Sequence, residues 1–460
     1  MKHISQAWVN WTCRPGCRPI APSSTALGKH SIAYGVRPGI LGLIALLGFA
    51  VAWRFFQSQS SGDPGVRTSP LPQQAYVWQR DWTASVQDAL IDHGPKMAGL
   101  VVLGAEVAWK RDGPRVIRVP IDHALLRKLD RPIGLCLRIG GYSGTFATNK
   151  AGAAVLDDLV QGMLSQAVSN RLDLAEFQID FDCAENRLEG YRRWLEQLRP
   201  RLGRTPLTIT ALPAWLKRRE FQSLARATEG YVLQVHSLER PRTISAPFIL
   251  CDPDAARRAV ATASRLGVPF RVALPTYGYL VAFDVRGNFL GLSAEGPKSA
   301  WPEGAQLRVV STDPASIVGL VRDWTSRPPS GLTGILWYRF PTARDERNWR
   351  WPTLETVMNG EFPTPVLRWE TRRSKPNVTE VFVCNDGAAN YLGPVTAKLS
   401  WKGAQLEARD ALAGFESVGE SADTLNLRSG LVQLRPGERR VAGWLRLTEE
   451  REVQIELETE

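Results

Sequence analysis

Eight short apolar stretches of the chain are strand-like, and in some of them, such as residues 176–182, apolar and polar residues alternate as in a half-buried β-strand. Between several of these stretches the apolar residues recur at helical spacing, as in residues 151–169 and 190–202. Asp252-Pro253 and Asp313-Pro314 each place a helix-capping aspartate before a proline that suits a first helical turn. The predicted strands cover residues 76–82, 99–109, 133–140, 176–182, 207–212, 231–237, 270–277 and 331–340.

Eight strands that alternate with helices over about 280 residues are typical of a (β/α)₈ TIM-type barrel. An open, doubly wound α/β sheet is the competing interpretation, and it favours a glycine-rich phosphate turn after the first strand. Residues 79–82 read Gln-Arg-Asp-Trp and contain no glycine. The sequence therefore predicts an α/β protein whose residues 75–360 form the barrel.

The chain changes character after the barrel. Prolines at positions 363, 365 and 376 accompany the end of the helical pattern. Short alternating segments separated by Gly, Pro and Asn turns follow, which indicates a small β-sandwich. We expect residues 365–460 to form an accessory domain, which either supports the barrel or binds a ligand or partner.

The N-terminal region has the pattern of an export signal. Residues 1–37 are basic, residues 38–56 contain the apolar run, and residues 57–74 have the composition of a linker. These features predict an exported, periplasmic protein. The apolar segment would anchor the chain to the inner membrane, or the chain would be released after signal cleavage; a buried core helix is the alternative for this segment.

Net charge and cysteine spacing argue against a nucleic-acid partner, a cofactor and a metal ion. The net charge is +11, but six positive charges lie in the first 62 residues, which contain no Asp or Glu. The remainder is only mildly basic, so we expect no nucleic-acid partner. The six cysteines show no pairing or zinc-type spacing, and nucleotide and zinc signatures are missing from the sequence, so we expect no cofactor and no metal.

The segment QIDFD, residues 178–182, carries the candidate chemistry. In a barrel the apolar Phe177, Ile179 and Phe181 must face the helices, so the polar side chains between them face inward. Gln178, Asp180 and Asp182 would then line the interior, with Asp182 nearest the carboxyl-terminal mouth where barrel enzymes place their chemistry. Carboxylates two residues apart lie ~7 Å apart along a strand, and one raises the pKa of the other.

Other strand ends add groups that suit a sugar, which offers hydroxyls to polar groups and an apolar face to aromatic rings. The candidate catalytic residues are Asp182 as general acid, Asp180 as the group that tunes it, and Glu106 or Glu185 as second carboxylate. The candidate substrate-binding residues are Gln178, Arg138, Gln234, His236, Tyr277, Trp337 and Tyr338.

Four of these candidates also have a structural interpretation. Asp182 could cap the next helix or form an ion pair with Arg138. His236 could be a hydrogen-bonded interior histidine, Glu106 could face solvent, and Trp337 could pack at the barrel end.

Three blocks, at residues 178–199, 207–216 and 231–238, resemble the uncharacterised bacterial exported proteins of domain-of-unknown-function family 3142. The resemblance covers roughly residues 75–345 and implies no established activity. More distantly, the segment around Asp180 resembles the DxxDxDxE motif of chitinase-type glycoside hydrolases. Asp180 and Asp182 match its second and third acids, whereas Phe177 and Ala184 occupy the positions of its first acid and its glutamate.

The sequence thus predicts a glycoside-hydrolase-like barrel that acts on, or binds, a polysaccharide or oligosaccharide. The alternative is a non-catalytic envelope protein that binds a glycan or a protein through the barrel mouth. A metal-dependent deacetylase is a third hypothesis, but it requires an Asp/His/His cluster and only His236 is suitably placed.

Overall fold

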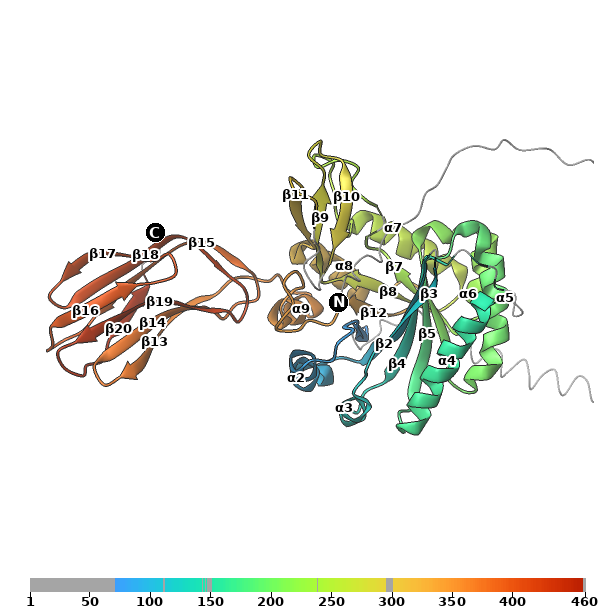
Figure 1. Ribbon diagram of the computed structural model, residues 1–460, viewed down its shortest axis with the longest axis horizontal. Helices are drawn as coiled ribbons and strands as arrows, with labels where there is room; N and C mark the ends of the chain where they lie inside the picture. Colours follow the sequence, from blue (N-terminus) through green and yellow to red (C-terminus); the bar gives the residue numbers. More distant parts are fainter. Residues whose placement is uncertain are drawn as a thin grey trace, which may run out of the picture. The chain divides into compact units, whose positions relative to one another are not determined.

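The computed structural model describes residues 71–457, except 111, 143, 145, 147–150, 238 and 295–300. Eight parallel strands form a closed ring in the order β1-β2-β4-β5-β6-β7-β8-β12, and β12 pairs with β1 to complete it. Helices cover the outside of this ring (Figure 1). The predicted TIM-type barrel is therefore confirmed.

The barrel strands are β1 (Gln73–Val77), β2 (Gly99–Lys110), β4 (Ile133–Gly140), β5 (Leu174–Phe181), β6 (Leu207–Ala211), β7 (Tyr231–Gln234), β8 (Phe270–Pro275) and β12 (Leu332–Tyr338). The helices are α2 (Ala84–His93), α3 (His123–Lys128), α4 (Ala151–Ser169), α5 (Leu188–Leu198), α6 (Arg219–Arg226), α7 (Pro253–Ala263), α8 (Pro314–Ser326) and α9 (Trp351–Met358).

All eight predicted strands are present, and the main difference is the start of the first. β1 begins at Gln73 and ends at Val77, whereas the alternation predicted residues 76–82. Its two leading glutamines resemble the polar linker before it, so hydropathy alone concealed the start of the strand. The capping prediction is confirmed, because Asp252 and Asp313 each accept hydrogen bonds from two backbone amides in the first turn of α7 and α8.

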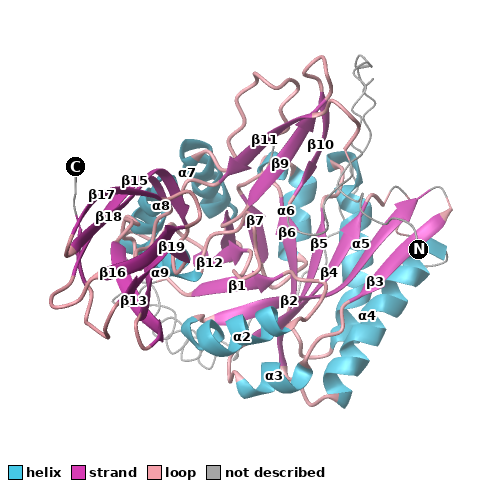
Figure 2. Cartoon of the chain, turned by 60° about the vertical axis from the view of Figure 1, so that its left-hand side comes forward, coloured by secondary structure: helices cyan, strands magenta, loops and turns pink. Residues whose placement is uncertain are grey.

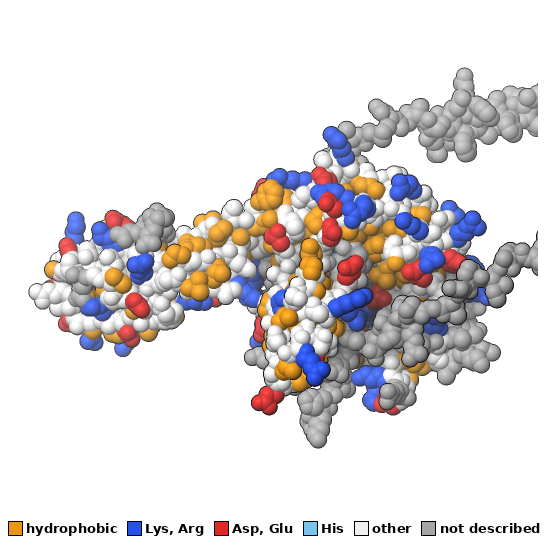
Figure 3. All heavy atoms as spheres, turned by 90° about the horizontal axis from the view of Figure 1, so that it is seen from above, with side chains coloured by type: hydrophobic (Ala, Val, Ile, Leu, Met, Phe, Trp, Pro, Cys, Tyr) orange, Lys and Arg blue, Asp and Glu red, His pale blue; other side chains and the backbone are white. Residues whose placement is uncertain are grey.

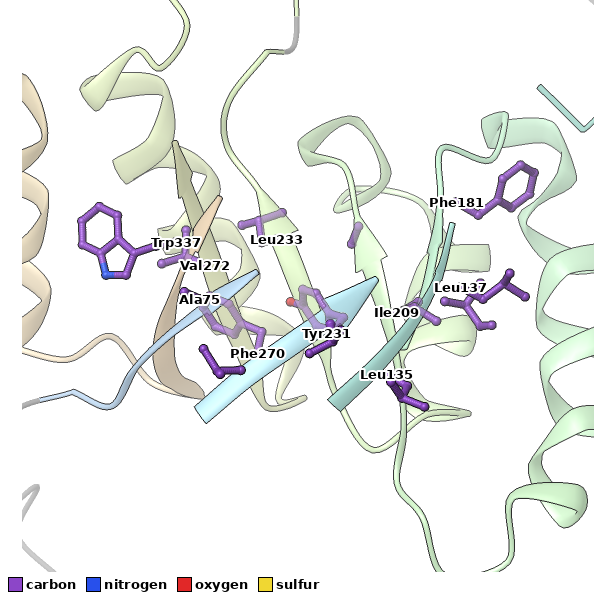
Figure 4. Packing of buried hydrophobic residues seen from close by; sticks show 14 of the residues in the cluster. Ala75, Leu135, Leu137, Phe181, Ile209, Tyr231, Leu233, Phe270, Val272 and Trp337 are labelled. Atoms are coloured by element: carbon purple, nitrogen blue, oxygen red, sulfur yellow. The ribbon is translucent and has the colours of Figure 1, made fainter. Parts of the chain in front are cut away.

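The largest apolar core lies between the barrel strands and the helices. Phe177, Ile179 and Phe181 of β5 are buried in it, as the alternation predicted. Figure 4 shows this layer, including Phe181, Ile209 and Trp337. A separate, smaller cluster that includes Tyr76, Trp78, Cys136 and Leu336 is built from the opposite faces of the same strands. The barrel interior is thus partly apolar and partly polar.

A three-stranded antiparallel sheet interrupts the barrel between β8 and α8, and the sequence pattern did not reveal it. Its strands are β9 (Gly278–Phe283), β10 (Phe289–Ser293) and β11 (Gln306–Ser311). β9 follows β8 after two residues, so this insert rises from the carboxyl end of a barrel strand (Figure 2). Tyr277 and Tyr279, at its base, belong to a buried cluster that also contacts Tyr338.

The C-terminal region contains two four-stranded antiparallel sheets around one apolar core, which confirms the predicted sandwich. One sheet has the order β13-β14-β19-β16 and the other β17-β18-β15-β20. The strands are β13 (Leu367–Lys375), β14 (Val378–Asn385), β15 (Tyr391–Ser400), β16 (Leu406–Ala411), β17 (Glu416–Ser421), β18 (Thr424–Leu434), β19 (Arg439–Leu447) and β20 (Gln454–Leu457). A further strand, β3 (Gly113–Arg118), forms a hairpin with β2.

The predicted basic segment, apolar segment and most of the linker, residues 1–70, lie outside the described residues. Within residues 71–457, apart from the gaps given above, no helix is long and apolar enough to cross a membrane. On the face shown in Figure 3, positive and negative side chains are interspersed.

Candidate active site at the barrel mouth

Polar side chains of β5 form a column inside the barrel, in the order that the alternation predicted. Glu176, at the amino-terminal end, forms a buried ion pair with Arg271 of β8. Gln178 is completely buried, accepts a hydrogen bond from the Tyr76 hydroxyl at 2.6 Å and donates to Thr208 at 3.3 Å. These partners satisfy polar groups that would otherwise be costly to bury.

Arg138 of β4 binds both aspartates that follow in the column. One guanidinium nitrogen lies 2.8 Å from Asp180, and the other lies 2.8 Å from Asp182. Burial by itself lowers the pKa of Arg138, but the two carboxylates raise it above its usual value. The ion pair between Asp182 and Arg138, one of the structural interpretations of the sequence, is therefore present.

Asp180 is the buried member of this pair of aspartates. Besides Arg138, Thr210 donates to its carboxylate at 2.8 Å and Gln234 at 3.2 Å. Burial raises the pKa of Asp180, whereas Arg138 acts in the opposite direction and Asp182 adds to the rise. Because three side chains donate to Asp180, its carboxylate has a fixed position and holds Arg138 in place.

Asp182 is the exposed end of the column. It lies one residue beyond β5, and its side chain remains 34% exposed, against 5% for Asp180. In the ion pair its carboxylate accepts a hydrogen bond from Arg138. Asp182 is thus the acid of this column that a ligand at the carboxyl-terminal mouth would contact.

A second carboxylate shares this mouth. Glu106 of β2 pairs in register with Arg138, which pairs in turn with Asp180, so the three residues form a row across adjacent strands. The Glu106 side chain is only 13% exposed and is ion-paired with Arg80, from the loop after β1. The interpretation that Glu106 faces solvent is therefore wrong, because its strand turns this side chain toward the ring interior.

Two candidates lie apart from this row. Glu185, in the short helical turn after β5, is ion-paired with Arg218, and both side chains are exposed. Trp337 is fully buried on the helix-facing side of β12, where its indole donates to Gln73 at 2.9 Å. The prediction that Trp337 lines the mouth is wrong, and its interpretation as packing is right: the neighbouring Leu336 and Tyr338 occupy the inward positions.

Aromatic rings surround Tyr338 in the interior. The rings of Tyr76, Trp78, His236 and Tyr277 all lie 5.3–5.7 Å from its ring, centroid to centroid. His236 stacks on Tyr338, and its Nδ1 lies 3.2 Å from the Tyr277 hydroxyl. Burial lowers the pKa of His236 to about 4, against the opposing effect of Asp182.

Several of these neighbours were missed by the sequence analysis. Tyr76 and Trp78 alternate in the first strand, so their period alone could have placed them inside. Nothing local could have paired Arg80 with Glu106, since 25 residues and a helix separate them along the chain. The described residues contain no cluster of three or more His, Cys, Asp or Glu side chains arranged to hold a metal ion.

Comparison with known proteins finds one family model that matches part of the chain. Residues 130–343 match the family described as "Domain of unknown function (DUF3142)". The three sequence blocks that suggested this resemblance all lie inside the matched residues, so the resemblance is confirmed over that range. No curated protein matches the chain.

Solved structures similar to the chain include chitinase-type glycoside hydrolases. The Bacillus cereus spore cortex-lytic enzyme SleL shares 15% identity, with a TM-score of 0.44, over 64% of this chain and 74% of its own. A Chromobacterium violaceum chitinase shares 15% identity, with a TM-score of 0.42, over 59% of this chain and 95% of its own. Chitinase ChiA74 from Bacillus thuringiensis shares 8% identity, with a TM-score of 0.41, over 85% of this chain and 100% of its own.

Proposed function

We propose that this chain is an exported, glycoside-hydrolase-like protein that binds a polysaccharide at the carboxyl-terminal mouth of its barrel. The exposure of Asp182 at the end of a buried polar column is the observation that carries the proposal. A carboxylate accepts hydrogen bonds from sugar hydroxyls, and the nearby cluster of rings around Tyr338 suits the apolar face of a sugar.

Hydrolysis is the second candidate function, and the position of Glu106 favours it. Glycosidases use two carboxyl groups on either side of the scissile bond, ~5–10 Å apart. Asp182 and Glu106 both reach the mouth, from β5 and β2, on the two sides of Arg138. Asp182 would be the general acid and Glu106 the second carboxylate, with Asp180 holding Arg138 in place.

Binding ranks first because all four candidate carboxylates are ion-paired with arginines. Arg138 binds Asp180 and Asp182, while Glu106 and Glu185 have one arginine each. A general acid must bring a proton to the reaction, whereas each of these carboxylates already has a guanidinium as its partner. The lack of a glutamate at position 184 points the same way.

The test uses the full-length chain with cellulose, xylan, chitin, chitosan, alginate and peptidoglycan. Retention on each polysaccharide is measured by sedimentation, and released products by mass spectrometry. Asp182→Asn and Glu106→Gln probe the mouth. Asp323→Asn is the matched control, since Asp323 forms an exposed ion pair on α8.

Binding without hydrolysis predicts retention that Asp182→Asn weakens and Asp323→Asn does not, with no products. Products from the parent chain that both mouth variants abolish would establish hydrolysis instead. Neither retention nor products from any of the six polysaccharides would overturn the proposal.

A further inference from the structure

A chain of three hydroxyl groups ends on the imidazole of His236. The Ser237 hydroxyl lies 3.0 Å from that of Tyr279, which lies 3.2 Å from that of Tyr277. The Tyr277 hydroxyl in turn lies 3.2 Å from Nδ1 of His236. The residues come from the end of β7 and from the start of the inserted sheet, so the fold builds this relay from two separate segments.

The relay is buried and its geometry is constrained. Tyr277, Tyr279 and His236 are each less than 9% exposed. Ser237 adopts a φ of 56°, in the left-handed region that is unfavourable for residues other than glycine. Ser237 has this strained backbone conformation while its hydroxyl contacts that of Tyr279. The first residue of the relay is therefore strained.

The other imidazole nitrogen of His236 has no hydrogen-bond partner in the part of the chain that the structure describes. Nε2 is buried and unpaired among the described residues, an unusual state for a polar atom. The ring itself is held by its stack on Tyr338 and its edge contact with Tyr277. With Nδ1 occupied by Tyr277, Nε2 is the ring atom left to bind a ligand.

A buried imidazole at neutral pH carries one proton, and the relay decides which nitrogen holds it. If the Tyr277 hydroxyl donates to Nδ1, the proton lies on Nε2. The negative charge of Asp182 acts against the effect of burial on the pKa of this ring. Nε2 would then be a donor, while the exposed carboxylate of Asp182 is an acceptor.

We propose that the relay of Ser237, Tyr279 and Tyr277 holds His236 with its proton on Nε2, and that this N–H donates to a sugar hydroxyl which itself donates to Asp182. The inference rests on the proposed function for its ligand. A donor beside an acceptor selects a hydroxyl group, whereas an ammonium group would need acceptors only. Tyr277 and Tyr279 are positioning residues in this scheme, and His236 contacts the ligand.

The protonation of His236 can be read directly. The chain has five histidines, so ¹⁵N-histidine labelling of the full-length protein produces a short set of ring signals, and His236→Gln assigns one of them. The expected signal of the parent chain is that of a neutral ring protonated on Nε2. Tyr277→Phe should shift this signal toward a mixture of the two neutral tautomers, and Tyr279→Phe should shift it less.

Tyr231→Phe is the matched control. The Tyr231 hydroxyl is buried and has no hydrogen-bond partner within the described part of the chain, and the residue lies on the helix-facing side of the same strand that leads to His236. The Tyr231→Phe variant should leave the His236 signal unchanged. A parent ring protonated on Nδ1, or a signal that Tyr277→Phe does not move, would overturn the relay.

The ligand contact is tested separately with the β-1,4-linked hexasaccharides of glucose and of N-acetylglucosamine. A bound hexasaccharide should shift the His236 Nε2 signal, and Tyr277→Phe should raise its Kd about two- to tenfold, the effect of one hydrogen bond. Binding that leaves the Nε2 signal unmoved would overturn the contact while the proposed function stands. If neither hexasaccharide nor any polysaccharide binds, the proposed function and the contact both fail. The ¹⁵N signal of His236 then still shows whether the relay holds the proton on Nε2.

Discussion

Arg138 and Asp180 lie opposite each other in the register of β4 and β5, and their charged groups meet at 2.8 Å inside the barrel. The second guanidinium nitrogen of Arg138 extends the same contact to Asp182 at the mouth. One buried cation therefore connects the buried Asp180 with the more exposed Asp182. The two aspartates differ mainly in burial, and this difference makes them separable by mutation.

Asp180→Asn is expected to lower the free energy of unfolding by about 3–5 kcal/mol, because Arg138 would remain buried without its innermost anion. Asp182→Asn should cost about 1 kcal/mol or less, since water partly solvates that pair. Urea unfolding, followed by tryptophan fluorescence, measures both. Equal losses in the two variants would show that Arg138 does not depend on the buried aspartate.

His236 should make the stability depend on pH. Burial keeps the pKa of His236 at about 4 in the folded chain, whereas an unfolded histidine binds its proton near pH 6.5. The neutral ring therefore makes its full contribution to the free energy of unfolding above about pH 6.5. This contribution, up to about 3 kcal/mol, is lost as the pH falls to about 4. Urea unfolding of the parent chain and of His236→Gln across this range isolates the effect, and parallel pH profiles would contradict it.

Trp337 and Tyr338 are adjacent but face opposite sides of β12, so their variants should affect different properties. Trp337→Phe removes buried volume and the hydrogen bond to Gln73, and should cost about 2 kcal/mol of stability without changing saccharide retention. Tyr338→Leu removes the central ring of the interior aromatic cluster and should weaken retention roughly tenfold. Weaker retention by the folded Trp337→Phe variant would contradict the assignment of Trp337 to the outer core.

The cap of α8 offers a local test of the barrel scaffold. Asp313 accepts hydrogen bonds from the amides of Ala315 and Ser316, and Asp313→Ala should cost about 1 kcal/mol. Asp323→Asn, which alters an exposed pair on the same helix, should change stability by less than about 0.5 kcal/mol. Thermal or urea unfolding compares the two, and similar losses would mean that the cap hydrogen bonds do not matter.

The sequence by itself determined the architecture and one face of the site. A strand repeats every two residues and a helix about every 3.6, so local hydropathy located the barrel strands except for the start of β1. The Asp-Pro pairs located the caps of α7 and α8. The same alternation placed Gln178 and Asp180 inside the barrel, because apolar neighbours had to face the helices. The inserted sheet of β9, β10 and β11, with strands of five or six residues, was not predicted.

Only the tertiary structure decided which partners each candidate has. Glu106, Arg138 and Asp180 come together because three parallel strands align in register. The relay to His236 forms because an insert after β8 packs beside β7. Trp337 and Tyr338 were indistinguishable as neighbouring aromatic residues until β12 oriented them to opposite faces. Contacts between distant segments depend on strand register and loop paths, and local sequence periodicity contains no information about either.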